Sequence, residues 1–133
     1  MNIQNKRGLA AEVARVLRAG GVFSCSELGR GETGEVTYPV PWASDAATSF
    51  LARPDEMRQA LAAGGLRVTG EIDLTEINRA AAREASERNK RGEPPLQQNN
   101  VVMGDDFPER AKHSTKGVLS GALVEFLFLA QKP

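Results

Sequence analysis

Apolar residues recur at helical spacing near the start of the chain, at relative positions i, i+4, i+7 and i+8. This spacing places them on one face of a helix, which we expect over residues 5–19. Asn2 or Asn5 can cap its start. The two glycines of the "RAGG" turn are expected to end it, because glycine accepts the left-handed conformation found there. A strand follows over residues 22–28. The apolar face of the helix consists of Leu9, Val13, Val16 and Leu17.

A long irregular segment separates this unit from the next helix and strand. Residues 29–51 contain three glycines and two prolines and predict a loop excursion. A second helix is expected from Pro54, because proline fits the first turn of a helix, and "GG" at positions 64–65 ends it. The alternating stretch "LRVTGEI", residues 66–72, predicts a strand with one solvent-exposed face, as at the edge of a sheet.

The remaining chain predicts two helices and a strand. The helix over residues 75–91 has an apolar face of alanines with Ile77, so we expect it to be weakly held. A further helix is expected to begin at Asp105 or Asp106. "ALVEFLFLA", residues 122–130, is apolar on both faces, which is typical of a strand inside a sheet. These elements predict an α/β chain that forms a single domain over its 133 residues.

Composition restricts the partners and the compartment. The 17 basic and 17 acidic residues give a net charge of zero, so no field of one sign attracts nucleic acid or an anionic membrane. A single cysteine excludes an internal disulfide and favours a reducing compartment. The start "MNIQNKRGL" has no apolar core of the signal-peptide type, and "GALVEFLFLA" is shorter than the roughly 20 residues that span a bilayer. We therefore expect a cytoplasmic protein without nucleic-acid or membrane partners.

The segment "GRGETG", residues 29–34, has the G-x-G-x-x-G spacing of a dinucleotide-binding loop. In that loop the glycines open a helix whose first N–H groups bind the phosphates. "EVTYPVPWA" follows instead, and its prolines exclude a regular helix. We interpret the segment as a flexible loop, which disfavours a nicotinamide oxidoreductase.

No catalytic or metal-binding group stands out. His113 is the only histidine and lies in a polar stretch without cysteines or carboxylates at metal-ligand spacing, so we expect a surface residue and no zinc site. Cys25 lies in an apolar strand and is expected to be a small core residue. Ser24 and Ser26 lack the G-x-S-x-G context of a serine hydrolase.

"EVARVLRAGGVFSCSE" resembles the helix, turn and fifth strand of class I S-adenosylmethionine-dependent methyltransferases, whose usual form is E-x-x-R-V-L-K-P-G-G. "YPVPWA" and "LARPDEMRQALAAGGLRVTGEIDLTE" are similar to the loop, helix, sixth strand and acceptor-side segment of small-molecule members of the sarcosine and dimethylglycine type or the quinone-biosynthesis type. "MGDDFPERAK" and "GALVEFLFLAQKP" are similar to the closing helix and seventh strand. Ala19 stands where the family usually has proline. The matching residues are Glu12, Arg15, Val16, Leu17, Gly20 and Gly21.

The resemblance implies a partial Rossmann-like methyltransferase fold. Its three-stranded mixed sheet would have the order five, seven, six, with the seventh strand antiparallel and helices alongside. The family's first half, with the glycine-rich loop after strand one and the acidic residue ending strand two, has no counterpart here. The chain is therefore expected to be a truncated C-terminal half. S-adenosylmethionine would be the cofactor of the intact enzyme, and this chain alone is expected to bind none and to be inactive.

The resemblance also implies a site for a small methyl acceptor. Asn2 corresponds to a segment near the methyl-transfer centre and can orient an acceptor by hydrogen bonding; the alternative is a frayed terminus or only a helix cap. Tyr38 and Trp42 lie in a proline-rich loop and can line the acceptor pocket; for Trp42 the alternative is an anchor that holds the loop. Asn99, in the acceptor-side segment 75–104, can face the substrate or form a turn.

The missing first half predicts self-association. Without the fourth strand of the family, strand 22–28 has an open apolar edge, and helix 5–19 loses part of its cover. Such edges and patches drive association, so we expect a homodimer or higher oligomer through this surface. The alternative function is a non-catalytic module that dimerises and binds a partner or small ligand through residues 38–51.

Overall fold

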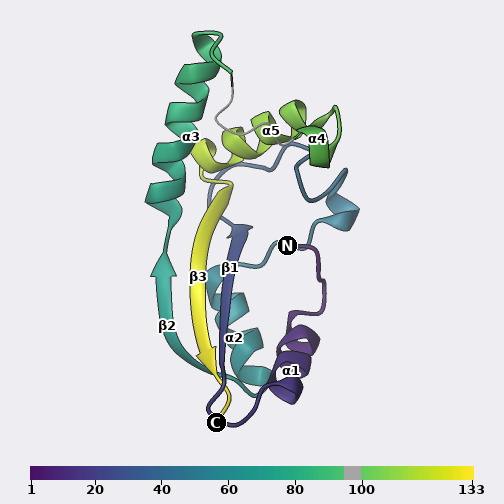
Figure 1. Cartoon of the computed structure of the whole chain (residues 1–133), viewed down its shortest axis with the longest axis vertical. Coiled ribbons are helices and arrows are strands. Elements are labelled where there is room, and N and C mark those ends of the chain that lie inside the picture. Colours follow the sequence, from purple (N-terminus) through teal and green to yellow (C-terminus); the bar gives the residue numbers. More distant parts are fainter. Residues whose placement is uncertain (95–99) are drawn as a thin grey trace. The chain divides into compact units, whose positions relative to one another are not determined.

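The computed structural model describes residues 1–94 and 100–133. The chain divides into two compact units, one formed by Met1–Arg30, Phe50–Leu74 and Glu125–Pro133 and the other by Gly31–Ser49 and Thr75–Val124. None of the helices in these described ranges is long and apolar enough to cross a membrane. The elements in chain order (Figure 1) are α1 (Lys6–Val16), β1 (Val22–Arg30), the short 3-10 helix η1 (Ala46–Thr48), α2 (Pro54–Ala63), β2 (Arg67–Asp73), α3 (Thr75–Lys90), α4 (Asn100–Met103), α5 (Phe107–Ser120) and β3 (Leu123–Gln131).

The first unit is built on a three-stranded sheet with the order β1-β3-β2. β2 and β3 are antiparallel, in a register that pairs Arg67 with Gln131 and Asp73 with Phe126. The ribbon of β1 also runs opposite to β3 (Figure 1). The predicted order five, seven, six, with the seventh strand antiparallel, is therefore confirmed. β3 is the central strand and β2 an edge strand, as their sequence patterns predict.

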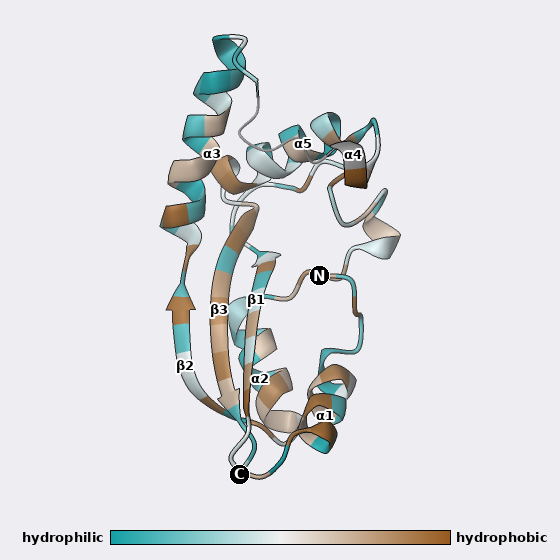
Figure 2. Ribbon diagram, in the orientation of Figure 1, coloured by the Kyte–Doolittle hydropathy of each residue, from teal (hydrophilic) through white to brown (hydrophobic). Residues whose placement is uncertain are grey.

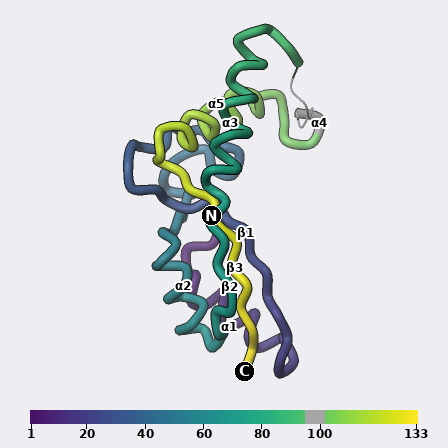
Figure 3. The backbone as a smooth tube through the Cα atoms, turned by 90° about the vertical axis from the view of Figure 1, so that its left-hand side faces the viewer, coloured from purple at the N-terminus to yellow at the C-terminus, as the bar shows by residue number. Residues whose placement is uncertain are grey.

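Helices α1 and α2 lie on the same face of this sheet (Figure 3). They approach closely at Gly64, where an added Cβ atom would stand 2.3 Å from the Cβ atom of Ala10. Met57 of α2 and Phe128 of β3 are fully buried, and the Phe126 and Phe128 rings meet edge to face with centroids 5.1 Å apart. Figure 2 shows hydrophobic residues concentrated along β3. Burial of each such large side chain contributes about 1.5–3 kcal/mol to folding.

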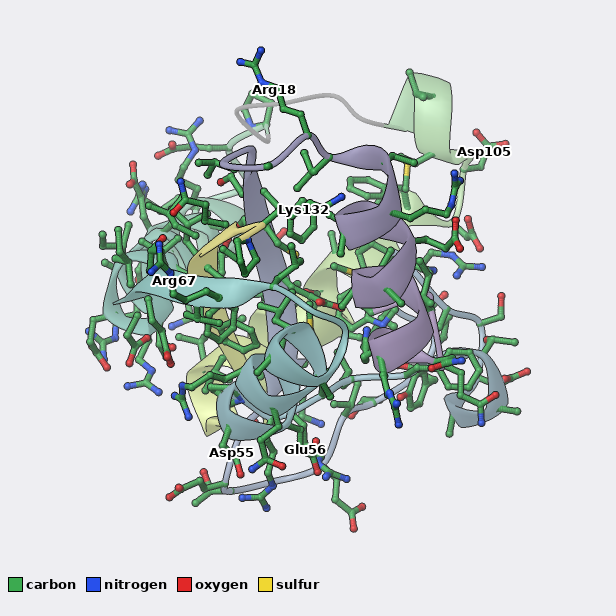
Figure 4. The ribbon with its side chains drawn as sticks, turned by 90° about the horizontal axis from the view of Figure 1, so that it is seen from below. Arg18, Asp55, Glu56, Arg67, Asp105 and Lys132 are labelled. Atoms are coloured by element: carbon green, nitrogen blue, oxygen red, sulfur yellow. The ribbon has the colours of Figure 1, made fainter. Side chains whose placement is uncertain are left out.

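Both helices of this unit have capped first turns. Asn5, rather than Asn2, caps α1, because its Oδ1 atom accepts the Gly8 N–H at 2.8 Å. At α2, Asp55 and Glu56 project from the first turn (Figure 4), where the helix dipole favours negative charge. The Glu56 carboxylate also accepts the N–H of Arg53 at 2.7 Å.

Two predicted details of this unit are wrong. α1 ends at Val16 rather than near residue 19, and Val16 is 66% exposed instead of lying on the apolar face. Leu17 is already extended, and its carbonyl accepts a hydrogen bond at 2.8 Å from Nζ of Lys132, which Figure 4 labels. Ile72 is 48% exposed rather than on the inner face with Leu66 and Val68, because the alternation of burial along β2 stops after Glu71.

The second unit combines the loop of residues 31–49 with α3, α4 and α5. α3 packs against α5. Thr75 and Ala82 are its buried residues, whereas Ile77 is 70% exposed and does not join the predicted apolar face. The small buried area agrees with a weakly held helix. α5 ends at Gly121, whose φ of 82° is the left-handed conformation that favours glycine.

Candidate functional site

Tyr38 and Trp42, two of the predicted acceptor-site residues, lie on one ordered turn of the second unit. Val40 and Ala43 close this turn with two backbone N–H···O bonds of 2.8 and 3.1 Å. Both of these residues are buried, at 0 and 5% exposure. The Tyr38–Pro39 peptide bond is cis. Tyr38 and Trp42 are themselves half-buried, so the structure brings the two rings onto one short, fixed segment.

The indole of Trp42 is tied to the far end of the same loop. Its Nε1–H donates to Oγ of Ser49 at 3.0 Å. Between these two residues, Asp45 caps η1 by accepting the Thr48 N–H at 3.2 Å. The bond to Ser49 is the contact expected of an anchor that holds the loop. A role of the Trp42 ring in an acceptor pocket stays a prediction.

Arg110 of α5 holds this loop in place through hydrogen bonds. The sequence analysis did not identify this residue. The two terminal nitrogens of its guanidinium donate to the Val40 carbonyl at 3.0 Å and to the Ser44 hydroxyl at 3.2 Å. Its Nε donates to the Asp106 carboxylate at 2.8 Å. The N–H groups of a planar guanidinium point in fixed directions, so one arginine can donate to three separate acceptors. The i, i+4 spacing of Asp106 and Arg110 is the one signal in the sequence that points to this arrangement.

His113 also contacts this loop and is not the surface residue that the sequence predicts. It is half-buried, and its Nδ1 lies 2.8 Å from the Pro39 carbonyl oxygen. A carbonyl only accepts, so Nδ1 carries the hydrogen in this contact. His113 and Arg110 lie one turn apart on α5 and hold two successive residues, Pro39 and Val40.

The structure describes one of the other two predicted site residues. Asn2 is exposed and belongs to the first unit. Asn99 lies outside the described residues. The structure therefore gathers Tyr38 and Trp42 from the predicted set, and it adds Arg110 and His113 as the residues that position their loop.

A charged cluster inside the first unit was also missed. Glu27 is 8% exposed. Its Oε1 atom accepts a hydrogen bond from Nζ of Lys6 at 2.7 Å and another from the α-amine of Met1. Glu27 shares the more buried face of β1 with Phe23 and Cys25. An acidic residue on the inward face of an alternating strand was the available sequence signal.

Burial shifts the pKa values in this cluster. Desolvation is the main reason why the pKa of the Met1 α-amine is lowered from 8.0 to about 5, and the hydrogen bond and the charge of Lys6 lower it further. Desolvation also raises the pKa of the Cys25 thiol. In both groups burial favours the neutral form over the charged form.

The "GRGETG" segment does not fit a cofactor loop. A Cβ atom at Gly29 would lie 2.4 Å from the ring of Phe126, and one at Gly31 would lie 1.9 Å from the carbonyl oxygen of Gly121. Neighbouring chain therefore fills the space that a ligand would need, and no helix opens behind the glycines. Gly29 and Arg30 belong to β1, whereas residues 31–34 form a loop in which residues 32–34 are exposed, so the predicted loop begins two residues later than expected. The described ranges also contain no group of three or more His, Cys, Asp or Glu side chains that could hold a metal ion.

No protein family and no curated protein matches the sequence. Solved structures do match. Phosphoethanolamine N-methyltransferase 2 of Haemonchus contortus, in complex with S-adenosyl-L-methionine, aligns with 99% of this chain at a TM-score of 0.68 and 15% identity. The geranyl diphosphate C-methyltransferase of Streptomyces coelicolor A3(2) aligns with 100% of it at 0.64 and 16%. A putative sarcosine dimethylglycine methyltransferase from Galdieria sulphuraria aligns with 99% of it at 0.59 and 17%.

The chain spans only part of each of these proteins, namely 31, 45 and 49% of their lengths. At sequence identities of 15, 16 and 17%, the structural similarity is evidence for the fold alone. The strand order β1-β3-β2 and the order of the helices agree with the segments quoted from the sequence. The chain therefore has the fold of the C-terminal half of class I S-adenosylmethionine-dependent methyltransferases.

Proposed function

We propose that this chain provides the acceptor side of an S-adenosylmethionine-dependent methyltransferase that modifies a small molecule. One observation carries the proposal. Nearly the whole chain aligns with methyltransferases, yet it covers 31 to 49% of the three compared above, and its glycine-rich segment does not fit a cofactor.

The loop that carries Tyr38 and Trp42 is proposed to form one side of the pocket for the methyl acceptor. Aromatic rings stabilise bound methyl and ammonium groups, and this loop must be rigid to orient the acceptor. Arg110 and His113 supply that rigidity through their bonds to the loop backbone. Neighbouring structures hold small ligands, namely phosphomonomethylethanolamine in one and geranyl diphosphate in another. Asn2 and Asn99 stay candidate acceptor contacts.

The cofactor site is proposed to lie outside the 133 residues, either elsewhere in a longer chain or on a partner chain. Bound there, S-adenosylmethionine would supply the methyl group. The residues of this chain would bind the acceptor, orient it and exclude water. By itself the chain would be inactive. A cytoplasmic location belongs to this proposal and is supported by the one free cysteine, Cys25.

Self-association is the second candidate function, and the edge of the sheet supports it. β1 is an edge strand in the order β1-β3-β2. Large apolar side chains near this edge and on α1 are exposed, with Val16 at 66% and Val22 at 58%. A second copy of the chain, paired along β1, would cover them. A non-catalytic dimeric module would use this surface without any cofactor.

A chimera tests the proposal. Residues 1–133 replace the matching part of the Galdieria sulphuraria protein, whose remaining part supplies the candidate cofactor site. Formation of S-adenosylhomocysteine is measured against a panel of small amines, alcohols and acids. We expect acceptor-dependent turnover that falls when Trp42 becomes Ala. A folded chimera that binds S-adenosylhomocysteine but shows turnover with no acceptor in the panel would contradict the proposal.

A further inference from the structure

We propose that Nε2 of His113 and the hydroxyl of Tyr38 together bind a hydroxyl group of a small ligand. The inference deepens the proposed function, on which it rests for the role of this ligand as methyl acceptor. The binding itself requires no cofactor.

The contact between His113 and the loop decides which ring nitrogen is available. Nδ1 lies 2.8 Å from the carbonyl oxygen of Pro39 and donates its hydrogen to that oxygen. A neutral imidazole carries one N–H, so a hydrogen held at Nδ1 leaves a lone pair on Nε2. None of the residues that the structure describes forms a hydrogen bond with Nε2. His113 therefore presents a hydrogen-bond acceptor that the fold does not use.

Tyr38 supplies a second polar group on the segment that His113 holds. It directly precedes Pro39, whose carbonyl binds the imidazole. Arg110 donates to the next carbonyl, that of Val40, at 3.0 Å. Among the described residues, none forms a hydrogen bond with the Tyr38 hydroxyl. The backbone of this segment is thus fixed by two side chains of α5, which keeps the entropy cost of ligand binding low.

Both polar groups can be reached by a ligand. In the described part of the chain, the fully buried side-chain nitrogens and oxygens without a partner are the Nε atoms of Arg79 and Arg88. Nε2 of His113 and the Tyr38 hydroxyl are therefore not sealed inside the protein, although both residues are half-buried. A few unpaired polar groups on half-buried, ordered side chains are typical of small-molecule sites.

The two groups together select a hydroxyl. Nε2 only accepts, so an ionised carboxylate or phosphate, which has no hydrogen to donate, does not fit. An ammonium ion donates but does not accept, so it leaves the O–H of Tyr38 without a partner. The oxygen of a hydroxyl can donate its hydrogen to Nε2 of His113 and accept the hydrogen of Tyr38. Methylation of that oxygen removes its hydrogen, so the product would bind more weakly than the substrate.

The test uses the full chain and three matched probes, namely benzyl alcohol, benzyl methyl ether, which lacks the O–H, and benzylamine, which is an ammonium ion at neutral pH. His113 is the only histidine of the chain, so a long-range proton–nitrogen NMR spectrum reports its ring nitrogens without overlap. We expect the hydrogen on Nδ1 in the free chain and a saturable shift of the Nε2 signal with benzyl alcohol but not with the ether. Benzylamine should bind about tenfold more weakly than benzyl alcohol, which corresponds to one hydrogen bond.

Two variants separate ligand binding from support of the loop. His113→Asn places an amide nitrogen where Nδ1 lies, so it can still donate to the Pro39 carbonyl, but it has no counterpart of Nε2. Tyr38→Phe removes only the hydroxyl. Both variants should bind benzyl alcohol about tenfold more weakly, as followed by the indole N–H signal of Trp42. The control variant Lys112→Met changes an exposed residue of α5 and should bind like the parent chain.

A hydrogen on Nε2 in the free chain, no saturable shift with benzyl alcohol, or parent-like affinity in either variant would overturn the inference. If faster hydrogen exchange at the Val40 amide shows that His113→Asn has opened the loop, Tyr38→Phe decides, because it breaks no hydrogen bond among the described residues. In the chimera, turnover of an amine without a hydroxyl that both variants leave intact would also overturn the inference, while leaving the proposed function standing. Binding as expected without any turnover by the chimera would contradict the proposed function alone.

Discussion

Nζ of Lys6 lies 2.7 Å from Oε1 of Glu27, although 21 positions separate the two residues in the chain. Lys6 is the first residue of α1 and Glu27 lies near the end of β1. A buried charge pair therefore joins the helix to the edge strand of the first unit, and this pair should govern the stability of that unit.

Replacing Lys6 by Met should destabilise the chain strongly, because the Glu27 carboxylate stays buried without its cation. Loss of one partner of a buried pair costs about 3–5 kcal/mol of the free energy of unfolding, and we expect the lower end because the Met1 amine can become charged instead. The double variant Lys6→Met/Glu27→Gln should recover much of this loss. Urea unfolding measures both.

The exposed pair of Arg15 and Glu12 provides the control for this experiment. Its side chains are 69 and 68% exposed, so Arg15→Met should cost less than about 1 kcal/mol. A similar loss for Arg15→Met and Lys6→Met, or a double variant no more stable than Lys6→Met alone, would disprove the role given to the buried pair.

Stability should rise with pH between about 5 and 8. The pKa of the Met1 α-amine is 8.0 in its ordinary state and about 5 in the folded chain. Between these values the unfolded chain binds more protons than the folded one, so raising the pH favours folding; the gain is lost as the pH falls back through 5. Urea midpoints measured across this range should climb, and acetylation of the α-amine should flatten that part of the curve. An equal slope after acetylation would contradict the assignment.

Alanine at Gly29 should destabilise the first unit. Its Cβ atom would stand 2.4 Å from the Phe126 ring and 2.6 Å from the Ala52 carbonyl oxygen. Such overpacking costs about 1–3 kcal/mol or more. Gly70→Ala is the matched control in β2, because its Cβ atom would meet Leu129 at an ordinary 3.4 Å. If thermal unfolding shows the same stability for both variants, the close packing assigned to Gly29 is incorrect.

Loss of Arg110 should loosen the candidate acceptor loop. In Arg110→Met the Val40 carbonyl keeps only the Ala43 N–H as its donor, and the Ser44 hydroxyl loses the bond from Arg110. A hydrogen bond from a charged donor is worth about 1.5–3 kcal/mol, and we expect the lower end here because the bond to Ser44 is exposed. We expect faster hydrogen exchange at the amides of Val40 and Ala43, which hold the turn closed. The control variant Lys112→Met changes an exposed residue on the same helix and should leave these exchange rates unchanged. Unchanged rates in Arg110→Met would show that Arg110 does not hold the loop in place.

The chain alone should self-associate through the edge of β1. A charged residue on an edge strand opposes pairing with another strand. The double variant Val16→Glu/Val22→Lys should therefore lower the mass measured by light scattering to that of one chain. A monomeric parent chain would contradict the proposed interface.

Local patterns predicted most of the fold. The 3.6-residue period of α1, the proline and glycines that bound α2 and the doubly apolar β3 each depend on near neighbours in the sequence. Their type and order could therefore be predicted directly. The end of α1 could not, because it is closed by Lys132, 115 positions away from Leu17.

The candidate site was less predictable, since it depends on distant pairs. Aromatic residues in a proline-rich loop drew attention to Tyr38 and Trp42. Their support comes from Arg110, which reaches the Val40 carbonyl across 70 positions. In the sequence, Glu27 is one polar residue of an alternating strand. Only the folded structure shows that Lys6 of α1 pairs with it. The spacing of residues along the chain does not predict such long-range contacts.

The most direct test of the central claim, that this chain carries the acceptor side and lacks the cofactor site, is calorimetric titration with S-adenosylhomocysteine. The titration is run on residues 1–133 alone and on the chimera with the Galdieria sulphuraria protein. We predict no binding by the chain alone and stoichiometric binding by the chimera. Stoichiometric binding by residues 1–133 alone would contradict the claim, because it would place a complete cofactor site within this chain.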